Sequence, residues 1–135
     1  MDCIFCKIIK GELPCNKVYE DDQVLAFLDI RPTNFGHTLV IPKNHYDSLI
    51  ETPIHEACAM MAVIQKITPA VLESVNAPAF NLHVNTGSVA GQVVSHTHYH
   101  IIPRFADDGY QLWHGKEISQ EELLNIAEKI TSLLS

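Results

Sequence analysis

Three histidines stand at alternate positions, 96, 98 and 100, in the second half of the chain. Successive side chains of an extended strand point to opposite faces, so residues two apart share a face. We therefore predict a strand over Ser95–Ile102 that carries the three imidazoles in one row. A neutral imidazole has a donor and an acceptor, and each needs a partner when it is buried. Three histidines in a row are therefore poorly suited to an apolar core, and the pattern indicates a catalytic or metal-binding role.

Two kinds of chemistry suit a histidine row, and the row alone leaves both open. An H-x-H-x-H strand can ligate a catalytic metal, as in metal-dependent hydrolases. It can also supply a histidine nucleophile with supporting rings, because neutral histidine has a free ring nitrogen near neutral pH.

A second group of candidate ligands lies at the start of the chain, where Cys3 and Cys6 form a C-x-x-C pair. A closed zinc site needs four N or S ligands, and the sequence has no second C-x-x-C. The missing partners would have to be histidines. Cys15 and Cys58 are predicted to be packed free thiols, the usual state of a free cysteine.

The apolar pattern predicts a mixture of short strands and two main helices. A helix is expected over Ile54–Val75, with Thr52 as N-cap, Pro53 in the first turn and Pro69 as a kink or interruption. Ser119 begins a capping-box pattern ahead of a C-terminal amphipathic helix. The other predicted strands are Val18–Glu20, Val24–Leu28, Thr38–Ile41 and Phe80–Asn85. Hairpins without regular βαβ alternation favour an α+β domain with a largely antiparallel sheet.

Composition limits the class of protein and its partners. The 135 residues are 47% hydrophobic with a net charge of −7, which fits one domain over 1–135 and argues against nucleic acid as a partner. The longest apolar run, Ala57–Ile64, is well short of the roughly 18 residues of a membrane span. The first residues have neither the basic start nor the apolar core of a signal peptide. We expect a cytoplasmic protein without a membrane partner.

The segment His96–Ile102 resembles the histidine triad (HIT) signature His-φ-His-φ-His-φ-φ, in which φ is apolar. Three further stretches resemble the same family in order and spacing. They are Leu28–Pro32, Gly36–Lys43, and Asn85–Gly87 with Gly91-Gln92. The resemblance covers about residues 3–105 and leaves 106–135 as a tail. It implies a HIT-type fold, a largely antiparallel five-stranded sheet with two main helices, and a sheet that continues across a homodimer.

The resemblance also implies an activity, hydrolysis at the α-phosphorus of purine nucleoside 5′-phosphoramidates or adenylylated compounds. It makes His98 the nucleophile, which would form a covalent nucleotidyl-histidine. A hydrogen bond from Nδ1 of His98 to a backbone carbonyl would leave Nε2 free to attack. His100 and His37 would orient groups and stabilise charge, and Gln92 would lie near the leaving group. The resemblance implies no organic cofactor.

The nucleotide-binding residues are carried over in the same way. Asp29 corresponds to the family's ribose contact, and Asn85 to a phosphate or leaving-group contact. Val93 stands where members often have Ser or Thr, so only its backbone N–H could contribute. His100 favours the hydrolase branch over the nucleotidyl-transferase branch, which has glutamine at that place. Together with Gln92 and His98, these residues make up the predicted nucleotide site.

Some bacterial members resembling this chain carry an N-terminal C-x-x-C with two histidines. Cys3, Cys6, His45 and His96 fit that set and would form a closed, structural zinc site. A ring nitrogen bound to zinc cannot attack phosphorus, so His96 would be scaffold while His98 remains the nucleophile.

Three other functions remain as alternatives. A dinucleoside polyphosphate hydrolase would use the same catalytic residues and differ only in the leaving group. A nucleotide-binding regulatory protein would bind a mononucleotide tightly with incidental turnover. A metallohydrolase would lose activity to a chelator and regain it with metal.

Overall fold

Five short apolar segments form one sheet in the computed structural model, which describes residues 2–134. The strand order is β1-β2-β3-β5-β4, and every neighbouring pair is antiparallel. This confirms the predicted α+β class and the antiparallel sheet. The strands are β1 (Lys17–Glu20), β2 (Val24–Leu28), β3 (Thr38–Pro42), β4 (Ala79–Val84) and β5 (Tyr99–Arg104).

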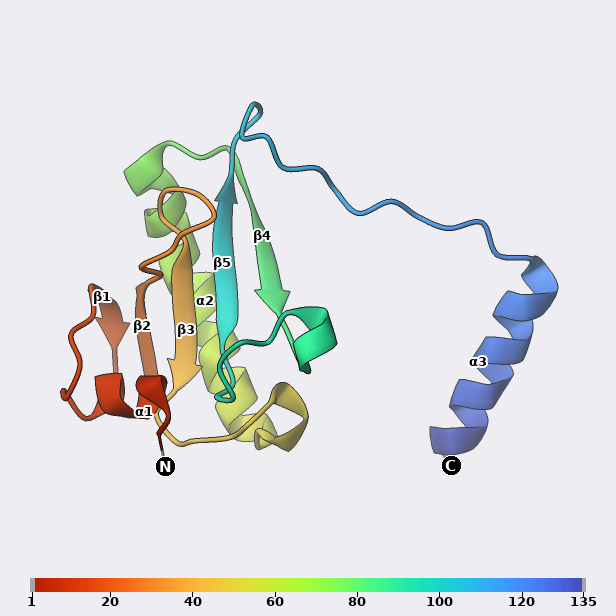
Figure 1. Ribbon diagram of the computed structural model, residues 1–135, viewed down its shortest axis with the longest axis horizontal. Helices are drawn as coiled ribbons and strands as arrows, with labels where there is room; N and C mark the ends of the chain where they lie inside the picture. The colour runs from red at the N-terminus through yellow and green to blue at the C-terminus, as the bar shows by residue number, and fades with distance from the viewer. Residues whose placement is uncertain (1, 135) are drawn as a thin grey trace.

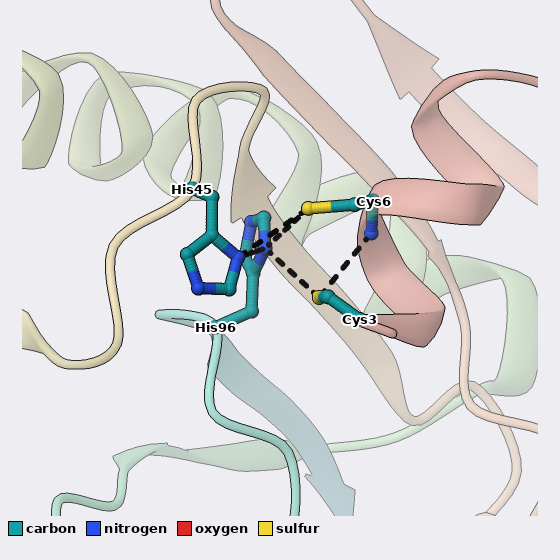
Figure 2. Close-up of side chains that lie close together, drawn as sticks. All are labelled: Cys3, Cys6, His45 and His96. Atoms are coloured by element: carbon teal, nitrogen blue, oxygen red, sulfur yellow. Dashed lines mark hydrogen bonds between the residues drawn. The ribbon is translucent and has the colours of Figure 1, made fainter. Parts of the chain in front are cut away.

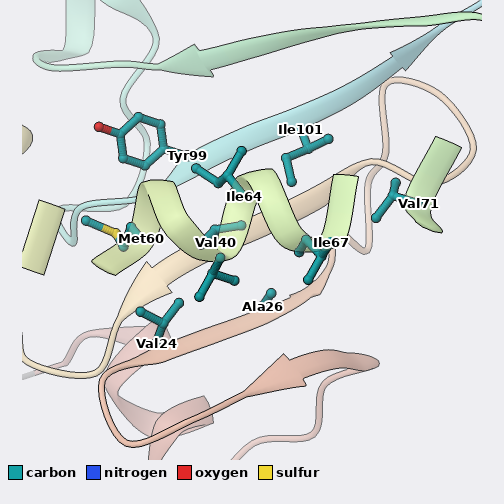
Figure 3. Packing of buried hydrophobic residues seen from close by; sticks show 10 residues of the cluster. Val24, Ala26, Val40, Met60, Ile64, Ile67, Val71, Tyr99 and Ile101 are labelled. Carbon is teal, nitrogen blue, oxygen red and sulfur yellow. The ribbon is translucent and has the colours of Figure 1, made fainter. Parts of the chain in front are cut away.

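One face of the sheet is covered by helix α2 (Ile54–Val75), as Figure 3 shows. Met60, Ile64 and Ile67 of the helix pack against side chains such as Val40 and Ile101 of the central strands. Removing this apolar surface from water is the main stabilising contribution to the fold. By length and composition alone α2 could cross a membrane. Its buried stripe on the sheet instead makes it the core helix.

The opposite face carries a helix that we had not predicted, α1 (Ile4–Ile9). Its first turn is capped by the Cys3 sulfur, which accepts from the backbone N–H of Cys6. Phe5 packs on Phe27, with ring centroids 5.6 Å apart, inside a second apolar cluster. Both faces of β2 and β3 are therefore buried, which explains why these strands are continuous apolar runs rather than alternating ones.

The histidine segment differs from the prediction, because β5 begins at Tyr99 rather than Ser95. Only His100 lies within the strand. The preceding residues bond to the end of β3 and to the loop after it. The N–H of Thr97 donates to the Tyr46 carbonyl at 2.8 Å, and the His96 ring bonds to the Pro42 carbonyl at 2.9 Å.

The N-terminus of α2 also corrects the prediction. Pro53, not Thr52, occupies the N-cap position and supplies no side-chain bond. The Thr52 hydroxyl instead donates to the Ser48 carbonyl and lies 2.8 Å from the Thr97 hydroxyl. Pro69 does not interrupt the helix, because buried residues on both sides of it, Ile67 and Val71, hold the helix on the sheet.

The C-terminal helix α3 (Gln120–Leu134) is present where the capping pattern predicted it. The Ser119 side chain accepts from the N–H of Glu122 at 3.2 Å. Residues 109–134 are all exposed, and Figure 1 shows α3 standing apart from the sheet. Cys58 of α2 is exposed too, so our expectation of a packed thiol was wrong at that position.

A polar cluster fixes the end of β5 and the loop that precedes β3. Arg104 donates to both carboxylate oxygens of Asp108, and the amide of Asn34 donates to Asp108 and to the Pro103 carbonyl. The guanidinium holds the pKa of the Asp108 carboxyl well below its usual range. The loop that leads into His37 is thereby tied to the main sheet.

Gly36 in this loop has a φ of +85°, and an added Cβ would meet side chains of Pro103 and Val75 at 3.2 Å. We expect Gly36→Ala to lower the free energy of unfolding by about 1–3 kcal/mol, because the backbone is left-handed there and the space is filled. Chemical denaturation measures the change. Gly115→Ala is the matched control, since no heavy atom lies within 4 Å of its added Cβ. Equal stability of the two variants would contradict the expectation.

Candidate functional site

A cavity of about 660 Å³ opens on the face of the sheet that carries α1. Much of its wall is apolar and comes from α1, β2 and β3, including Phe5, Phe27 and Leu39. The polar side chains that line it include Asp29, Arg31, His98 and His100. A concave apolar site with a few convergent polar groups is typical of a small-molecule site.

His98 presents one free ring nitrogen. Its Nδ1 lies 2.6 Å from the His96 carbonyl oxygen, so Nδ1 carries the proton and donates, and Nε2 keeps its lone pair. The ring is buried and meets Phe5 edge-on, with centroids 5.2 Å apart. Burial lowers the pKa of His98 from its usual value, although the hydrogen bond to the carbonyl opposes that shift. The neutral, unprotonated form therefore dominates near pH 7.

His37 and His100 form a chain whose proton positions are set by the backbone. The N–H of Thr33 donates to Nδ1 of His37 at 3.0 Å, which places the His37 proton on Nε2. That nitrogen lies 2.9 Å from Nδ1 of His100, which must accept. The proton of neutral His100 is therefore on Nε2. Burial, with the neighbouring His98 and His37, lowers the pKa of His100 to about 4.

Asp29 follows β2 directly and is held by its own turn. One carboxylate oxygen accepts from the N–H of Arg31 at 2.8 Å, and the other lies 3.6 Å from Nε2 of His37. Burial lowers the pKa of His37, and the Asp29 charge acts in the opposite direction. The cavity is thus lined by a carboxylate and by the His100 ring, and His37 contacts both of these groups.

The remaining predicted site residues differ in where they lie. Val93 lines the cavity and is 92% exposed. The side-chain amide of Gln92 is hydrogen-bonded to backbone groups. Its oxygen accepts from the N–H of Gly87, and its NH₂ donates to the carbonyls of Asp47 and Val94. The Asn85 side chain packs against Gly91, next to Gln92 in the chain, since a Cβ added to Gly91 would be 3.4 Å from the Asn85 side-chain nitrogen.

Cys3, Cys6, His45 and His96 come together from three distant parts of the chain, as Figure 2 shows. Their ligand atoms all lie within 4.8 Å of one another. Nδ1 of His96 is 3.4 Å and 3.7 Å from the two sulfurs, and Nδ1 of His45 is 3.3 Å from the Cys6 sulfur. Zinc bond lengths in a tetrahedron give S–N edges of about 3.6 Å and an N–N edge of about 3.3 Å.

The outward-facing nitrogens of both histidines are already occupied. Nε2 of His96 donates to the Pro42 carbonyl, and Nε2 of His45 donates to Asp47, each at 2.9 Å. Each Nδ1 atom then carries an unprotonated lone pair, and the two Nδ1 atoms lie 3.1 Å apart. A cation bound between them would stabilise this arrangement. The donor set and the geometry fit zinc. Burial and the neighbouring Cys3 raise the pKa of the Cys6 thiol, and a metal would reverse this by binding the thiolate.

Several residues that shape the site were not predicted from the sequence. Phe5 lines the cavity and its ring meets those of His96 and His98. Its apolar neighbour Ile8, at helical spacing, was the available signal. Pro42 and Asp47 bond to Nε2 of His96 and Nε2 of His45 and so orient the two rings. The N–H of Thr33 sets the proton of His37. The Pro42 carbonyl and the Thr33 N–H are backbone groups, which every residue type can supply, so no sequence pattern marks them.

The fold and site define a class of α+β protein in which a histidine cluster faces a cavity beside a cysteine–histidine group. Residues 10–107 match the model of the HIT domain family. The chain belongs to that family.

Named relatives include two enzymes. Adenylylsulfatase HINT3 from Arabidopsis thaliana is 48% identical over 122 residues, which are 90% of this chain, and this chain spans 61% of that protein. Adenosine 5′-monophosphoramidase hnt1 from Schizosaccharomyces pombe is 41% identical over 135 residues, with 98% of each chain covered.

Solved structures agree with the fold. The crystal structure of a HIT family member from Bacillus subtilis has a TM-score of 0.92 at 41% identity and covers 100% of this chain and 99% of its own. A zinc-bound histidine triad family protein from Mycobacterium smegmatis has a TM-score of 0.76 at 39% identity and covers 100% of this chain and 99% of its own.

Proposed function

We propose that this protein hydrolyses purine nucleoside 5′-phosphoramidates or adenylylated compounds at the α-phosphorus, through a covalent intermediate on His98. The observation that carries the proposal is the single free Nε2 of His98 at the polar end of the cavity. The two relatives named as an adenylylsulfatase and an adenosine 5′-monophosphoramidase support this substrate class.

The cavity suggests how such a substrate would bind. The base would lie against the apolar wall near Phe27 and Leu39, and the ribose hydroxyls would donate to the Asp29 carboxylate. The α-phosphate would then be beside His98 and His100. The Nε2–H of His100 would donate to a phosphate oxygen and stabilise the charge that develops in the transition state.

The reaction would run in two displacements. Nε2 of His98 attacks the α-phosphorus, and the bond to the leaving nitrogen or oxygen breaks with its electron pair. The leaving group takes up a proton from solvent, and the nucleotidyl-imidazolium is stabilised by the bond from Nδ1 to the His96 carbonyl. Water then attacks the same phosphorus, loses a proton, and releases AMP and neutral His98.

The decisive test is a rapid quench with adenosine 5′-phosphoramidate, followed by intact-protein mass spectrometry. The quench uses denaturant at alkaline pH, because the bond between phosphorus and histidine nitrogen is labile in acid. We expect a mass gain of one AMP that maps to the peptide containing His98 and is absent from His98→Ala. Diadenosine polyphosphate in a parallel assay separates the two leaving-group classes by their kcat/KM values.

If the adduct breaks down faster than it forms, it will not accumulate, and the stereochemistry at phosphorus then tests for the covalent intermediate. A substrate chiral at the α-phosphorus should give product with retained configuration, because two displacements each invert it. Inversion would overturn the covalent mechanism. Tight AMP binding without turnover of any amidate or anhydride would favour a regulatory nucleotide-binding protein instead.

Asp29→Asn tests the ribose contact. We expect kcat/KM to fall about 10–100-fold, mainly through KM, because charge-assisted hydrogen bonds contribute about 1.5–3 kcal/mol. The variant should also lose its preference for ribose over a 2′,3′-dideoxyribose substrate. A fall in kcat with the sugar preference intact would assign Asp29 to the support of His37 instead, which lies 3.6 Å away.

We further propose that Cys3, Cys6, His45 and His96 hold a structural zinc ion. Four N and S ligands leave no position for water, so the ion would fix α1 and the segment leading to His98 without taking part in hydrolysis. The zinc-bound relative supports this assignment. Thiol ligands suit a reducing compartment, and we propose the cytoplasm.

A homodimer with a continuous sheet is also a proposal. Its support is β4, which pairs only with β5 and leaves its other edge open among the described strands. An open edge presents unpaired N–H and C=O groups, and these favour the addition of another strand.

A further inference from the structure

Glu56 is a buried carboxylate that the proposed reaction does not use. It lies in the first turn of α2 and is only 5% exposed. No ion pair within residues 2–134 involves it. A buried carboxylate needs hydrogen-bond donors in place of water, because its desolvation is otherwise costly. The donors that Glu56 has found therefore indicate what it holds in place.

Both donors come from the loop between β3 and α2, and they flank His45 in the chain. The Asn44 side-chain amide donates to one carboxylate oxygen of Glu56 at 2.8 Å, and the Tyr46 hydroxyl donates to the other. The bond to Glu56, together with burial, raises the pKa of the Tyr46 hydroxyl, so this group keeps its proton and donates near pH 7. The loop is thereby fixed to the start of α2.

The backbone of Tyr46 in turn holds the histidine segment. Its carbonyl accepts from the N–H of Thr97 at 2.8 Å and from the Thr97 hydroxyl at 3.2 Å. Thr97 stands between His96 and His98, and the pairing of β5 with its neighbours begins only at Tyr99. Sheet pairing therefore does not fix the Thr97 backbone, and the Tyr46 carbonyl supplies a contact that does.

We propose that Glu56 is a positioning residue for the nucleophile, although it does not line the cavity. Glu56 holds Tyr46, Tyr46 holds the Thr97 backbone, and the same backbone segment accepts the Nδ1–H of His98 through the His96 carbonyl. A small displacement of a nucleophile slows bond formation far more than it weakens ligand binding. The inference rests on the function proposed above and deepens it by a residue outside the site.

The kinetic test compares Glu56→Ala with Glu56→Gln in single-turnover assays with adenosine 5′-phosphoramidate. Glu56→Ala should lower the rate of AMP formation about 10–100-fold, while the Kd for AMP stays within about threefold of the natural value. Glu56→Gln should restore most of the rate, because the amide oxygen still accepts from the Tyr46 hydroxyl. Zinc is supplied to all samples, because the same loop carries His45.

Val71→Ala is the matched control for a general loss of stability. Val71 is buried on the sheet near the other end of α2, so its truncation destabilises the same helix without changing the bonds of Glu56. This variant should keep the natural single-turnover rate. An equal loss of rate in Val71→Ala and Glu56→Ala would overturn the positioning role.

Amide hydrogen exchange tests the structural link without substrate. In Glu56→Ala the Thr97 amide should exchange at least about 10-fold faster relative to the amides of β5, whereas Glu56→Gln and Val71→Ala should leave this ratio unchanged. Unchanged Thr97 exchange in Glu56→Ala, or faster exchange with the natural rate of AMP formation, would overturn the proposal. If Glu56→Ala fails to fold, Tyr46→Phe removes only the hydroxyl and carries the same expectations. A natural protein without turnover would refute the proposed function, and Thr97 exchange would still decide whether Glu56 holds the segment.

Discussion

Replacing His98 by alanine is expected to reduce turnover of adenosine 5′-phosphoramidate by at least about 10⁴-fold, with the fold unchanged. Nε2 of His98 is the free histidine nitrogen that the hydrogen-bond network leaves with a lone pair at the cavity. Removing a nucleophile eliminates the covalent route and leaves only positioning and charge stabilisation. Steady-state release of AMP measures the loss, and circular dichroism with thermal unfolding checks the fold.

The matched control is His55→Ala, since His55 is exposed at the start of α2 and does not line the cavity. It should keep full activity. A His98→Ala protein that retains more than about a hundredth of the natural kcat/KM would remove His98 from the role of nucleophile. AMP binding by the inactive variant would show that the cavity is intact.

Cys3→Ala is expected to lose stoichiometric zinc and to unfold several degrees below the natural protein. Cys3 is one of four grouped ligands and also caps α1, so its loss would release the helix that forms a wall of the cavity. Metal binding contributes directly to folding free energy where the unfolded chain lacks a preformed site. Elemental analysis of reduced, purified protein and thermal unfolding with and without a chelator measure both effects.

Cys58→Ala is the control for this prediction, because Cys58 is exposed on α2 and lies outside the metal group. It should retain one zinc per chain and the natural unfolding temperature. If Cys3→Ala fails to fold, removal and return of zinc in the natural protein still give the shift. A natural protein with less than a tenth of an equivalent of zinc would refute the site.

Within one row of histidines, the environment decides the role of each ring. The His96 ring bonds through Nε2 to the Pro42 carbonyl and directs Nδ1 to the cysteines. His98 has the opposite arrangement, with Nδ1 bonded and Nε2 free. The spacing predicted a shared face, and the ring contacts of Phe5 with both histidines agree with it.

The sequence predicted the large elements well, because each is set by a local pattern. The apolar spacing of α2, the strands β2 to β4 and the capping residue Ser119 all lie where expected, within a residue or two. It also selected four candidate metal ligands that the fold does bring together. It misplaced the start of β5 and the N-cap of α2, because both depend on bonds with the loop around Tyr46 and Ser48.

Residue type and spacing were enough to predict the strand and helix pattern, the family signature and the candidate residues. The tertiary structure alone decided which nitrogen of each histidine is free, that the Gln92 amide is held by backbone, and that α3 lies away from its own core. The physical reason is that hydrogen-bond partners and buried surfaces come from segments far apart in the chain. The partner carbonyl of His96, for example, is 54 residues away.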